Sequence, residues 1–255
     1  ITGYILIILQ ADAMENKYEI RNSSDQLIFS CNDLIEFYSF METNNNYWFA
    51  FTGVSEQNVN LIMNDEIYSI KTDQFAGRFY CQFTVKKIIK SPDVLYACLS
   101  LTSRICTEMY SEMYKVGALS FLKEADDLEE RVWLDMKGSL KLIYISASYL
   151  KNGIPRTLDK DTIVIEGKYI QDYYAFFCEL GHAFIGKFGY MGSCIDDVSQ
   201  LVEDLCSKDR KINVIWKDSD LSFKAIDNTL PVNCEMSASD FLLGTLEEYC
   251  NVILE

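Results

Sequence analysis

The chain has 255 residues, enough for two domains or for one large domain. Hydrophobic residues make up 49% of it and charged residues 24%, which supplies a core and excludes intrinsic disorder. The net charge of −15 argues against a general nucleic-acid binder, because phosphate contacts need clustered Lys and Arg. Two interpretations of this charge remain, a cationic partner or a surface charged for solubility.

The first 13 residues contain an apolar stretch, Tyr4–Leu9, that is too short to span a bilayer. Met14 precedes a polar run and is a candidate natural start, which would make residues 1–13 a leader or an extraneous segment. A genuine first strand is the alternative. The rest of the sequence offers no transmembrane candidate, so we expect a cytoplasmic protein that binds no membrane.

Residues 14–155 are predicted to form an α+β domain whose sheet is largely antiparallel. The aromatic residues gathered between positions 47 and 83 indicate a sheet core, with a binding surface as the alternative. The turn-rich stretch Lys151–Pro155 is the predicted domain boundary. Helices are predicted over 32–40 and 105–123, and strands over 47–53, 58–63, 66–71, 78–89, 94–101, 132–136 and 140–147, with a hairpin turn at Asn64-Asp65.

The C-terminal residues alternate between short β-branched runs and helical patterns. Strands are predicted over 162–165, 212–216 and 252–254, helices over 172–182, 195–205 and 237–249, a glycine-rich loop over 184–193, and an irregular stretch over 217–236. This order implies crossover connections, and therefore a small parallel sheet with helices packed against it. The second helix has an apolar stripe, and its other face carries Asp196, Asp197, Gln200, Glu203 and Asp204.

Cysteine and histidine usage limits the chemistry. The nine cysteines include no Cys-x-x-Cys, which excludes a zinc ribbon, a thioredoxin motif and a disulfide-rich scaffold. The single histidine, His182, excludes metal sites that need several histidines, and we expect no metal and no cofactor. His182 and Cys178 would share a helix face and are the one catalytic pair visible. A histidine near a helix end is the simpler interpretation, so the protein is not expected to be an enzyme.

Four blocks of the C-terminal part resemble the barstar-like family of ribonuclease inhibitors and immunity proteins. They are IVIEG at 163–167, YMGSCIDDV at 190–198, INVIW at 212–216 and NVILE at 251–255, so the resemblance covers roughly residues 161–255. It implies that residues 158–255 form a barstar-like α/β domain with a three-stranded parallel sheet. It also implies an antitoxin that binds a cationic toxin, most simply a bacterial ribonuclease.

The second block departs from the family pattern at informative positions. Met191 replaces an aromatic residue, and Cys194 stands where asparagine is usual. Gln200 stands where the family has the aspartate that enters the nuclease active site, so neighbouring carboxylates would have to supply the charge. The predicted partner-binding residues are Tyr190, Met191, Gly192, Cys194, Ile195, Asp196, Asp197, Gln200, Glu203 and Asp204.

The charge distribution agrees with such a surface. Residues 158–255 contain 18 acidic and 8 basic side chains, so they hold most of the excess negative charge. Carboxylates can take the place of phosphate oxygens at a cationic nuclease site through charge-assisted hydrogen bonds. The competing interpretations are a solvated helix face, core positions for Tyr190 and Met191, and a protein-binding module that no longer inhibits, which Gln200 favours. The sequence leaves the role of residues 14–155 open.

Overall fold

The structure, a computed structural model, divides into two compact units that are interleaved in the sequence. Unit 1 contains the described residues up to Thr72 together with Phe83–Ser100, and unit 2 contains Asp73–Gln82 and the described residues from position 112 onward. The boundary expected at Lys151–Pro155 therefore falls inside unit 2. The structure describes residues 17–37, 46–55, 58–91, 94–100, 112–206, 211–229 and 237–255, so the expectations for residues 1–13 lie outside it.

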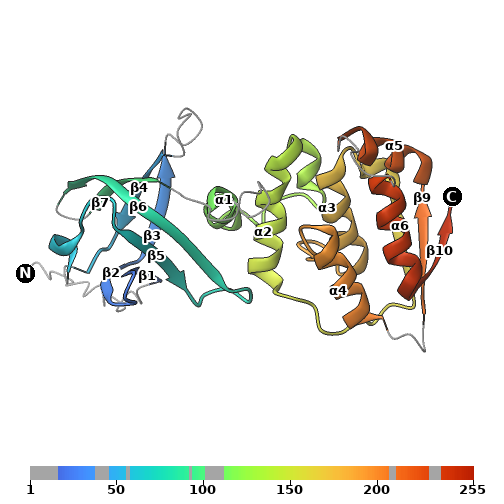
Figure 1. Ribbon diagram of the computed structural model, residues 1–255, viewed down its shortest axis with the longest axis horizontal. Helices are drawn as coiled ribbons and strands as arrows, with labels where there is room; N and C mark the ends of the chain where they lie inside the picture. Colours follow the sequence, from blue (N-terminus) through green and yellow to red (C-terminus); the bar gives the residue numbers. More distant parts are fainter. Residues whose placement is uncertain are drawn as a thin grey trace, which may run out of the picture. The chain divides into compact units, whose positions relative to one another are not determined.

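An antiparallel sheet of seven strands, in the order β2-β1-β5-β6-β7-β4-β3, belongs to unit 1 except for the first four residues of β6, Phe79–Gln82, which are assigned to unit 2 (Figure 1). Only Asn32 separates β2 from β3, so one bent segment of chain supplies both outer strands. The strands are β1 (Tyr18–Asn22), β2 (Leu27–Cys31), β3 (Asp33–Phe37), β4 (Asn46–Thr52), β5 (Ile67–Thr72), β6 (Phe79–Lys90) and β7 (Val94–Ser100). The largely antiparallel sheet expected for this part of the chain is confirmed.

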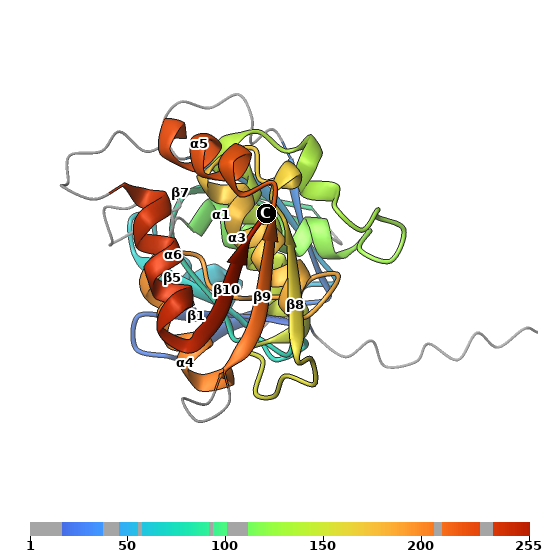
Figure 2. The ribbon, with the colours of Figure 1, turned by 90° about the vertical axis from the view of Figure 1, so that its right-hand side faces the viewer.

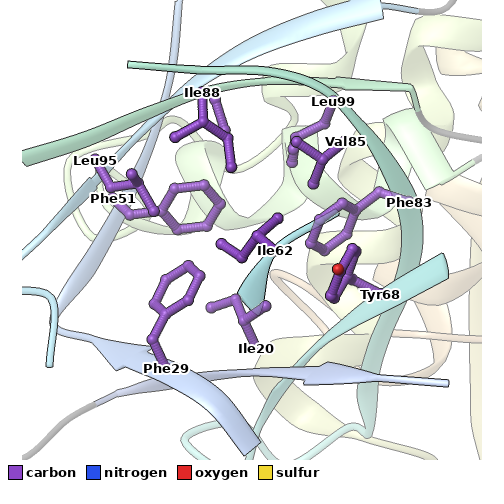
Figure 3. A pocket seen from close by; sticks show the side chains of 11 residues that line it. Ile20, Phe29, Phe51, Ile62, Tyr68, Phe83, Val85, Ile88, Leu95 and Leu99 are labelled. Carbon is purple, nitrogen blue, oxygen red and sulfur yellow. The ribbon is translucent and has the colours of Figure 1, made fainter. Parts of the chain in front are cut away.

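The strands of unit 1 bury alternate side chains in a common apolar interior (Figure 3). Phe29 and Phe51 meet there edge to face, with their ring centroids 5.3 Å apart. Tyr68 and Phe83 stack at 5.9 Å. The residual cavity measures about 10 Å³, room for one water at most, so this interior is a core and not a ligand pocket.

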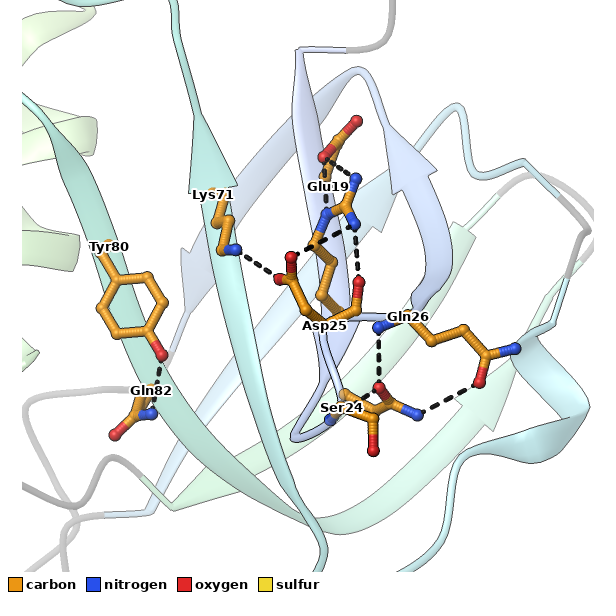
Figure 4. Close-up of polar contacts among 9 residues, drawn as sticks. Glu19, Ser24, Asp25, Gln26, Lys71, Tyr80 and Gln82 are labelled. Carbon is orange, nitrogen blue, oxygen red and sulfur yellow. Dashed lines mark hydrogen bonds and ion pairs between the residues drawn. The ribbon is translucent and has the colours of Figure 1, made fainter.

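The turn between β1 and β2 is fixed by side-chain contacts with the backbone and with β5 (Figure 4). The Asn22 carboxamide oxygen accepts hydrogen bonds from the backbone N–H groups of Ser24 at 3.1 Å and Gln26 at 2.9 Å. Asp25 has a φ of +62°, and its carboxylate pairs with Lys71 of β5. Figure 4 also shows the amide of a β6 glutamine donating to the hydroxyl of Tyr80 two residues earlier.

Two predictions for unit 1 were wrong. The helix expected over 32–40 is strand β3 as far as residue 37, because pairing with β4 imposes a period of two that buries Leu34 and exposes Ile35. Residues 38–40 lie outside the described part. The strand expected over 58–63 is a single 3₁₀ turn, Val59–Leu61, so the following turn at Asp65 does not join two strands.

Unit 2 contains a three-stranded parallel sheet in the order β10-β9-β8, with helices packed against it (Figure 2). Its elements are α1 (Glu112–Leu122), α2 (Lys141–Asn152), β8 (Thr162–Glu166), α3 (Tyr173–Phe184), α4 (Ile195–Leu205), β9 (Ile212–Lys217), α5 (Ser219–Thr229), α6 (Ala238–Tyr249) and β10 (Cys250–Leu254). The parallel sheet and α3, α4 and α6 are confirmed. Helix α5 occupies part of the stretch expected to be irregular, and the N-terminal part of the helix expected over 105–123 lies outside the described residues.

The strands expected over 132–136 and 140–147 are also wrong. Residues Val132–Asp135 form a 3₁₀ helix that buries Trp133. Helix α2 replaces the second strand, because Leu142, Ile145 and Tyr149 recur at helical spacing toward neighbouring helices. The β-branched and aromatic composition of this segment favoured a strand, and tertiary packing overrode that preference.

Two buried ion pairs join α2 and the preceding turn to α3. Arg131 binds the Glu179 carboxylate through two hydrogen bonds of 2.8 and 3.1 Å, and the Glu179 side chain has no exposed surface. Lys141, which is 1% exposed, lies 2.7 Å from Asp172. These contacts explain why residues before position 155 belong to the same compact unit as the parallel sheet.

Segment Asp73–Gln82 packs against the end of α2. The N–H of Gly77 donates to the carbonyl of Leu150 at 3.0 Å, and the N–H of Arg78 donates to the hydroxyl of Tyr149 at 3.1 Å. A Cβ atom on Gly77 would lie 2.2 Å from the Tyr149 carbonyl oxygen, so only glycine allows this approach. Within the described residues, no helix is both long and apolar enough to cross a membrane.

Candidate partner-binding surface

The loop between α3 and α4 is held by close backbone packing. A Cβ on Gly181 of α3 or on Gly189 of the loop would lie 2.2 or 2.0 Å from the carbonyl oxygen of the other. Phe188 has a φ of +56°, which bulky residues rarely adopt. Its buried ring stacks on Tyr144 at 5.2 Å, and its N–H donates to the Tyr144 hydroxyl at 3.0 Å. These contacts hold the strained backbone in place and fix where α4 begins.

The first turn of α4 depends on Gly192 and Asp197. Gly192 has a φ of +97°, and a Cβ there would lie 2.7 Å from the Cβ of Asp197, so the position requires glycine. The Asp197 carboxylate accepts hydrogen bonds from the N–H of Ser193 at 3.0 Å and from its hydroxyl at 2.9 Å. Cys194 occupies the N-cap position without a capping bond from its side chain. Asp197 therefore stabilises the helix start and is the predicted carboxylate least available to a partner.

The predicted apolar contact residues divide between core and surface. Met191 has no exposed surface, so it belongs to the core, one of the two interpretations left open by the sequence. Tyr190 is half-buried, and its ring centroid lies 5.2 Å from that of Tyr149 on α2. Ile195 is also half-buried, at the first position of α4. Tyr190 and Ile195 thus each keep part of their surface exposed, one in the loop before α4 and the other at the first position of α4.

Helix α4 is amphipathic, as its spacing predicts. Val198, Leu201 and Val202 are buried. On the opposite face the exposed residues are Asp196, Gln200, Glu203 and Asp204. Gln200 lies in the middle of this stripe and is exposed and uncharged.

Helix α6 packs against α4 and extends the acidic surface. It contributes three exposed carboxylates and an exposed aromatic side chain, Phe241, whose exposed fraction is 47%. Burial raises the pKa of Tyr249, with a further contribution from the charges of Glu203 on α4 and Glu248 on α6. A carboxylate from each helix therefore lies close enough to Tyr249 to raise its pKa. We call this surface the acidic helix pair: Asp196, Asp197, Glu203 and Asp204 with Asp240, Glu247 and Glu248.

Neither α4 nor α6 contains a lysine or an arginine. A charge count of each predicted helix would have shown this for α6 as well as for α4. The adjacency of the two helices was not predictable from such a count, because it depends on how they pack.

The Cys178–His182 pair has features that oppose nucleophilic catalysis. Cys178 is buried in α3, and burial raises the pKa of its thiol well above the ordinary value, which disfavours the thiolate. The Nε2 atom of His182 lies 3.2 Å from the Glu130 carboxylate, and its ring packs against Trp133 at 5.7 Å. These contacts join α3 to residues 130–133 and give His182 a structural role.

A cationic hollow in unit 1 is an exception to the acidic composition. It is open to solvent and includes Lys86, Lys87 and Lys90, near the end of β6. Lys86 pairs with Asp65, and Lys90 donates to the side chain of Asn60. Three lysines within five residues of sequence indicate such a surface, although the net charge of the chain gives no sign of it.

Comparisons with protein-family models, with curated proteins and with solved structures gave no match. In the described part of the chain, no group of three or more His, Cys, Asp and Glu side chains is arranged to hold a metal ion.

Proposed function

We propose that unit 2 binds a cationic protein through the acidic helix pair and blocks that protein's active site. The observation that supports this most directly is the packing of α4 against α6, two helices that carry seven carboxylates in all and contain no basic residue. A solvated helix face ordinarily mixes both signs of charge. The half-buried Tyr190 and the exposed Phe241 add apolar contact area of the kind that anchors protein interfaces.

The proposed partner is a ribonuclease toxin, and the chain would be its immunity protein in a bacterial cytoplasm. The resemblance of residues 161–255 to the barstar-like family supports this choice of partner, and the odd number of nine cysteines supports the compartment. A ribonuclease surrounds the cleaved phosphate with cationic side chains. Asp196, Glu203 and Asp204 can bind those side chains with charge-assisted hydrogen bonds, while the opposite net charges accelerate the encounter.

An inhibition titration tests the proposal. A small basic microbial ribonuclease, of the type that barstar-like proteins inhibit, is mixed with increasing amounts of this protein, and cleavage of a fluorogenic RNA is followed. We expect cleavage to stop near one equivalent. Undiminished cleavage at a large excess would contradict inhibition of this enzyme class.

A pair of matched variants locates the surface. The triple variant Asp196→Lys, Glu203→Lys and Asp204→Lys reverses the exposed charges of α4, and it leaves the structural Asp197 in place. The control reverses three exposed carboxylates outside the acidic helix pair: Asp127→Lys, Glu129→Lys and Asp159→Lys. Both variants change the net charge equally, so we expect at least about 100-fold weaker inhibition only for the α4 variant. Equal losses would show that overall charge, and not this surface, drives binding.

A second candidate function is binding without inhibition, which the exposed and uncharged Gln200 favours. Calorimetry with the same ribonuclease separates the two functions, because it measures binding whether or not cleavage stops. Binding with continued cleavage would support the module. The variant Gln200→Asp would then be expected to create inhibition if the missing carboxylate is the reason.

A further inference from the structure

Two cysteine thiols of unit 2 are in contact although they are 44 positions apart in the chain. The Sγ atoms of Cys206 and Cys250 lie 3.7 Å apart, and each residue is 2% exposed. Cys206 is the residue after α4, and Cys250 is the first residue of β10, directly after α6. The contact therefore joins the ends of two helices without using any of their carboxylates.

We propose that Cys206 and Cys250 form a reversible dithiol–disulfide site that hydrogen peroxide oxidises. A disulfide has an S–S distance of about 2 Å, so the sulfurs must approach by roughly 1.7 Å from their present 3.7 Å. Both backbones are held in place. The N–H of Cys206 donates to the carbonyl of Val202 at 2.8 Å, and Cys250 pairs in register with Ile212 of β9. Side-chain rotation therefore accounts for most of the approach.

The two thiols have different reactivities. The hydrogen bond from the Cys250 thiol lowers the pKa of Cys206, because it stabilises the thiolate. The same contact, with burial as a second cause, raises the pKa of Cys250. Since the thiolate is the nucleophile, we take Cys206 as the attacking cysteine and Cys250 as the resolving cysteine. Burial of both sulfurs favours a small oxidant such as peroxide over a bulky disulfide such as oxidised glutathione.

The chemistry balances with one molecule of peroxide. The Cys206 thiolate attacks one peroxide oxygen, so an S–O bond forms, the O–O bond breaks and the departing hydroxide takes up a proton to become water. The Cys250 sulfur then attacks the sulfenic sulfur of Cys206, forming the S–S bond and breaking the S–O bond, and a second water leaves with the thiol proton. The two thiols together lose two electrons and two protons, and a dithiol reductant reverses the reaction by exchange.

The test uses the full chain, reduced and then freed of reductant. After treatment with stoichiometric hydrogen peroxide, peptide mapping without reduction is expected to find the Cys206 peptide linked to the Cys250 peptide. The intact mass should fall by two hydrogens, and the midpoint of thermal unfolding should rise by about 5 °C, because the cross-link restricts the unfolded chain. Dithiothreitol should restore both values.

Two variants sharpen the result. Cys250→Ser should abolish the cross-link and leave a sulfenic acid at Cys206 that dimedone traps. Cys194→Ser is the matched control, because it removes a half-buried cysteine at the opposite end of α4 and should leave the cross-link intact. The proposal is overturned if folded wild-type protein forms its disulfides elsewhere, or if both sulfurs reach the sulfinic state without linking. Neither outcome depends on ribonuclease binding, so this proposal and the proposed function can fail separately.

Discussion

Replacing Arg131 by methionine would leave the Glu179 carboxylate buried without its partner. The wild-type carboxylate has no exposed surface and receives two hydrogen bonds from the guanidinium, whereas Arg131 is 24% exposed and also lies over the ring of Tyr169, 4.3 Å from its centroid. In R131M, Glu179 keeps one long hydrogen bond of 3.3 Å from the N–H of Glu166. Removing Arg131 thus leaves a fully buried carboxylate, whereas removing the charge of Glu179 leaves a guanidinium that is partly exposed to water.

The expected magnitude follows from that asymmetry. Removing one partner of a buried ion pair usually costs about 3–5 kcal/mol. Because water can reach the partly exposed Arg131 position, we expect R131M to lower the free energy of unfolding of unit 2 by about 3 kcal/mol. The variant Glu179→Gln should cost only about 1 kcal/mol, since it keeps an acceptor and leaves a charge that water can hydrate.

Urea unfolding followed by tryptophan fluorescence measures the effect, in a Trp48→Phe background so that the signal reports the buried Trp133 and Trp216 of unit 2. A larger loss for E179Q than for R131M would refute this account of the pair.

Four further substitutions should have distinct effects on stability. Gly181→Ala should cost about 2–3 kcal/mol in urea unfolding, because its Cβ would meet the Gly189 carbonyl at 2.2 Å, whereas Gly244→Ala, with no atom within 4 Å, should stabilise α6 by about 0.5–1 kcal/mol. Asp197→Ala should cost about 1 kcal/mol through loss of its capping bonds, and an unchanged midpoint would contradict the role assigned to them. A hydrogen bond from Lys217 is the main reason that the pKa of Glu166 lies below 4.5. The ionised carboxylate therefore contributes to the free energy of unfolding above that pH, and the contribution is lost as the pH falls through the lowered pKa. The stability difference between wild type and Glu166→Gln should therefore narrow on acidification, and an acid-independent difference would disprove the link.

The sheet of unit 2 was predictable because local signals agreed with the tertiary packing. The β-branched runs at 162–165 and 212–216 alternate with helical spacing, and Ser237 supplies a capping side chain that accepts the N–H of Asp240 at 3.0 Å. The strand predicted over 140–147 was wrong because Ile143, Tyr144 and Ile145 favour a strand by composition, although the segment is helical. The burial of Tyr144 and Ile145 among helices decides the outcome, and one sequence does not contain that information.

The candidate surface was predictable only for the part that one helix carries. The stripe from Asp196 to Asp204 follows from the 3.6-residue period, and the structure exposes Asp196, Glu203 and Asp204 as expected. Asp197 instead binds the backbone N–H and the hydroxyl of Ser193. The contribution of α6 depends on a contact between helices that are distant in the chain. The same holds for Glu179, which the sequence shows as a lone charge in an apolar helix, although nothing in the spacing identifies Arg131 as its partner.

Because the chain is synthesised from its N-terminus, the interleaved segment Asp73–Gln82 is made before the part of unit 2 against which it packs. Its partners in unit 2, Tyr149 and Leu150, are translated later, and at about 5–20 residues per second the ribosome needs roughly 3–14 s to pass from position 82 to position 150. The strands of unit 1 are complete once β7 has emerged, within that interval. At that stage residues 79–82 already belong to β6 of the sheet, whereas residues 73–78 still lack the helix against which they pack. Residues 73–78 are therefore where cotranslational proteolysis or chaperone binding should concentrate.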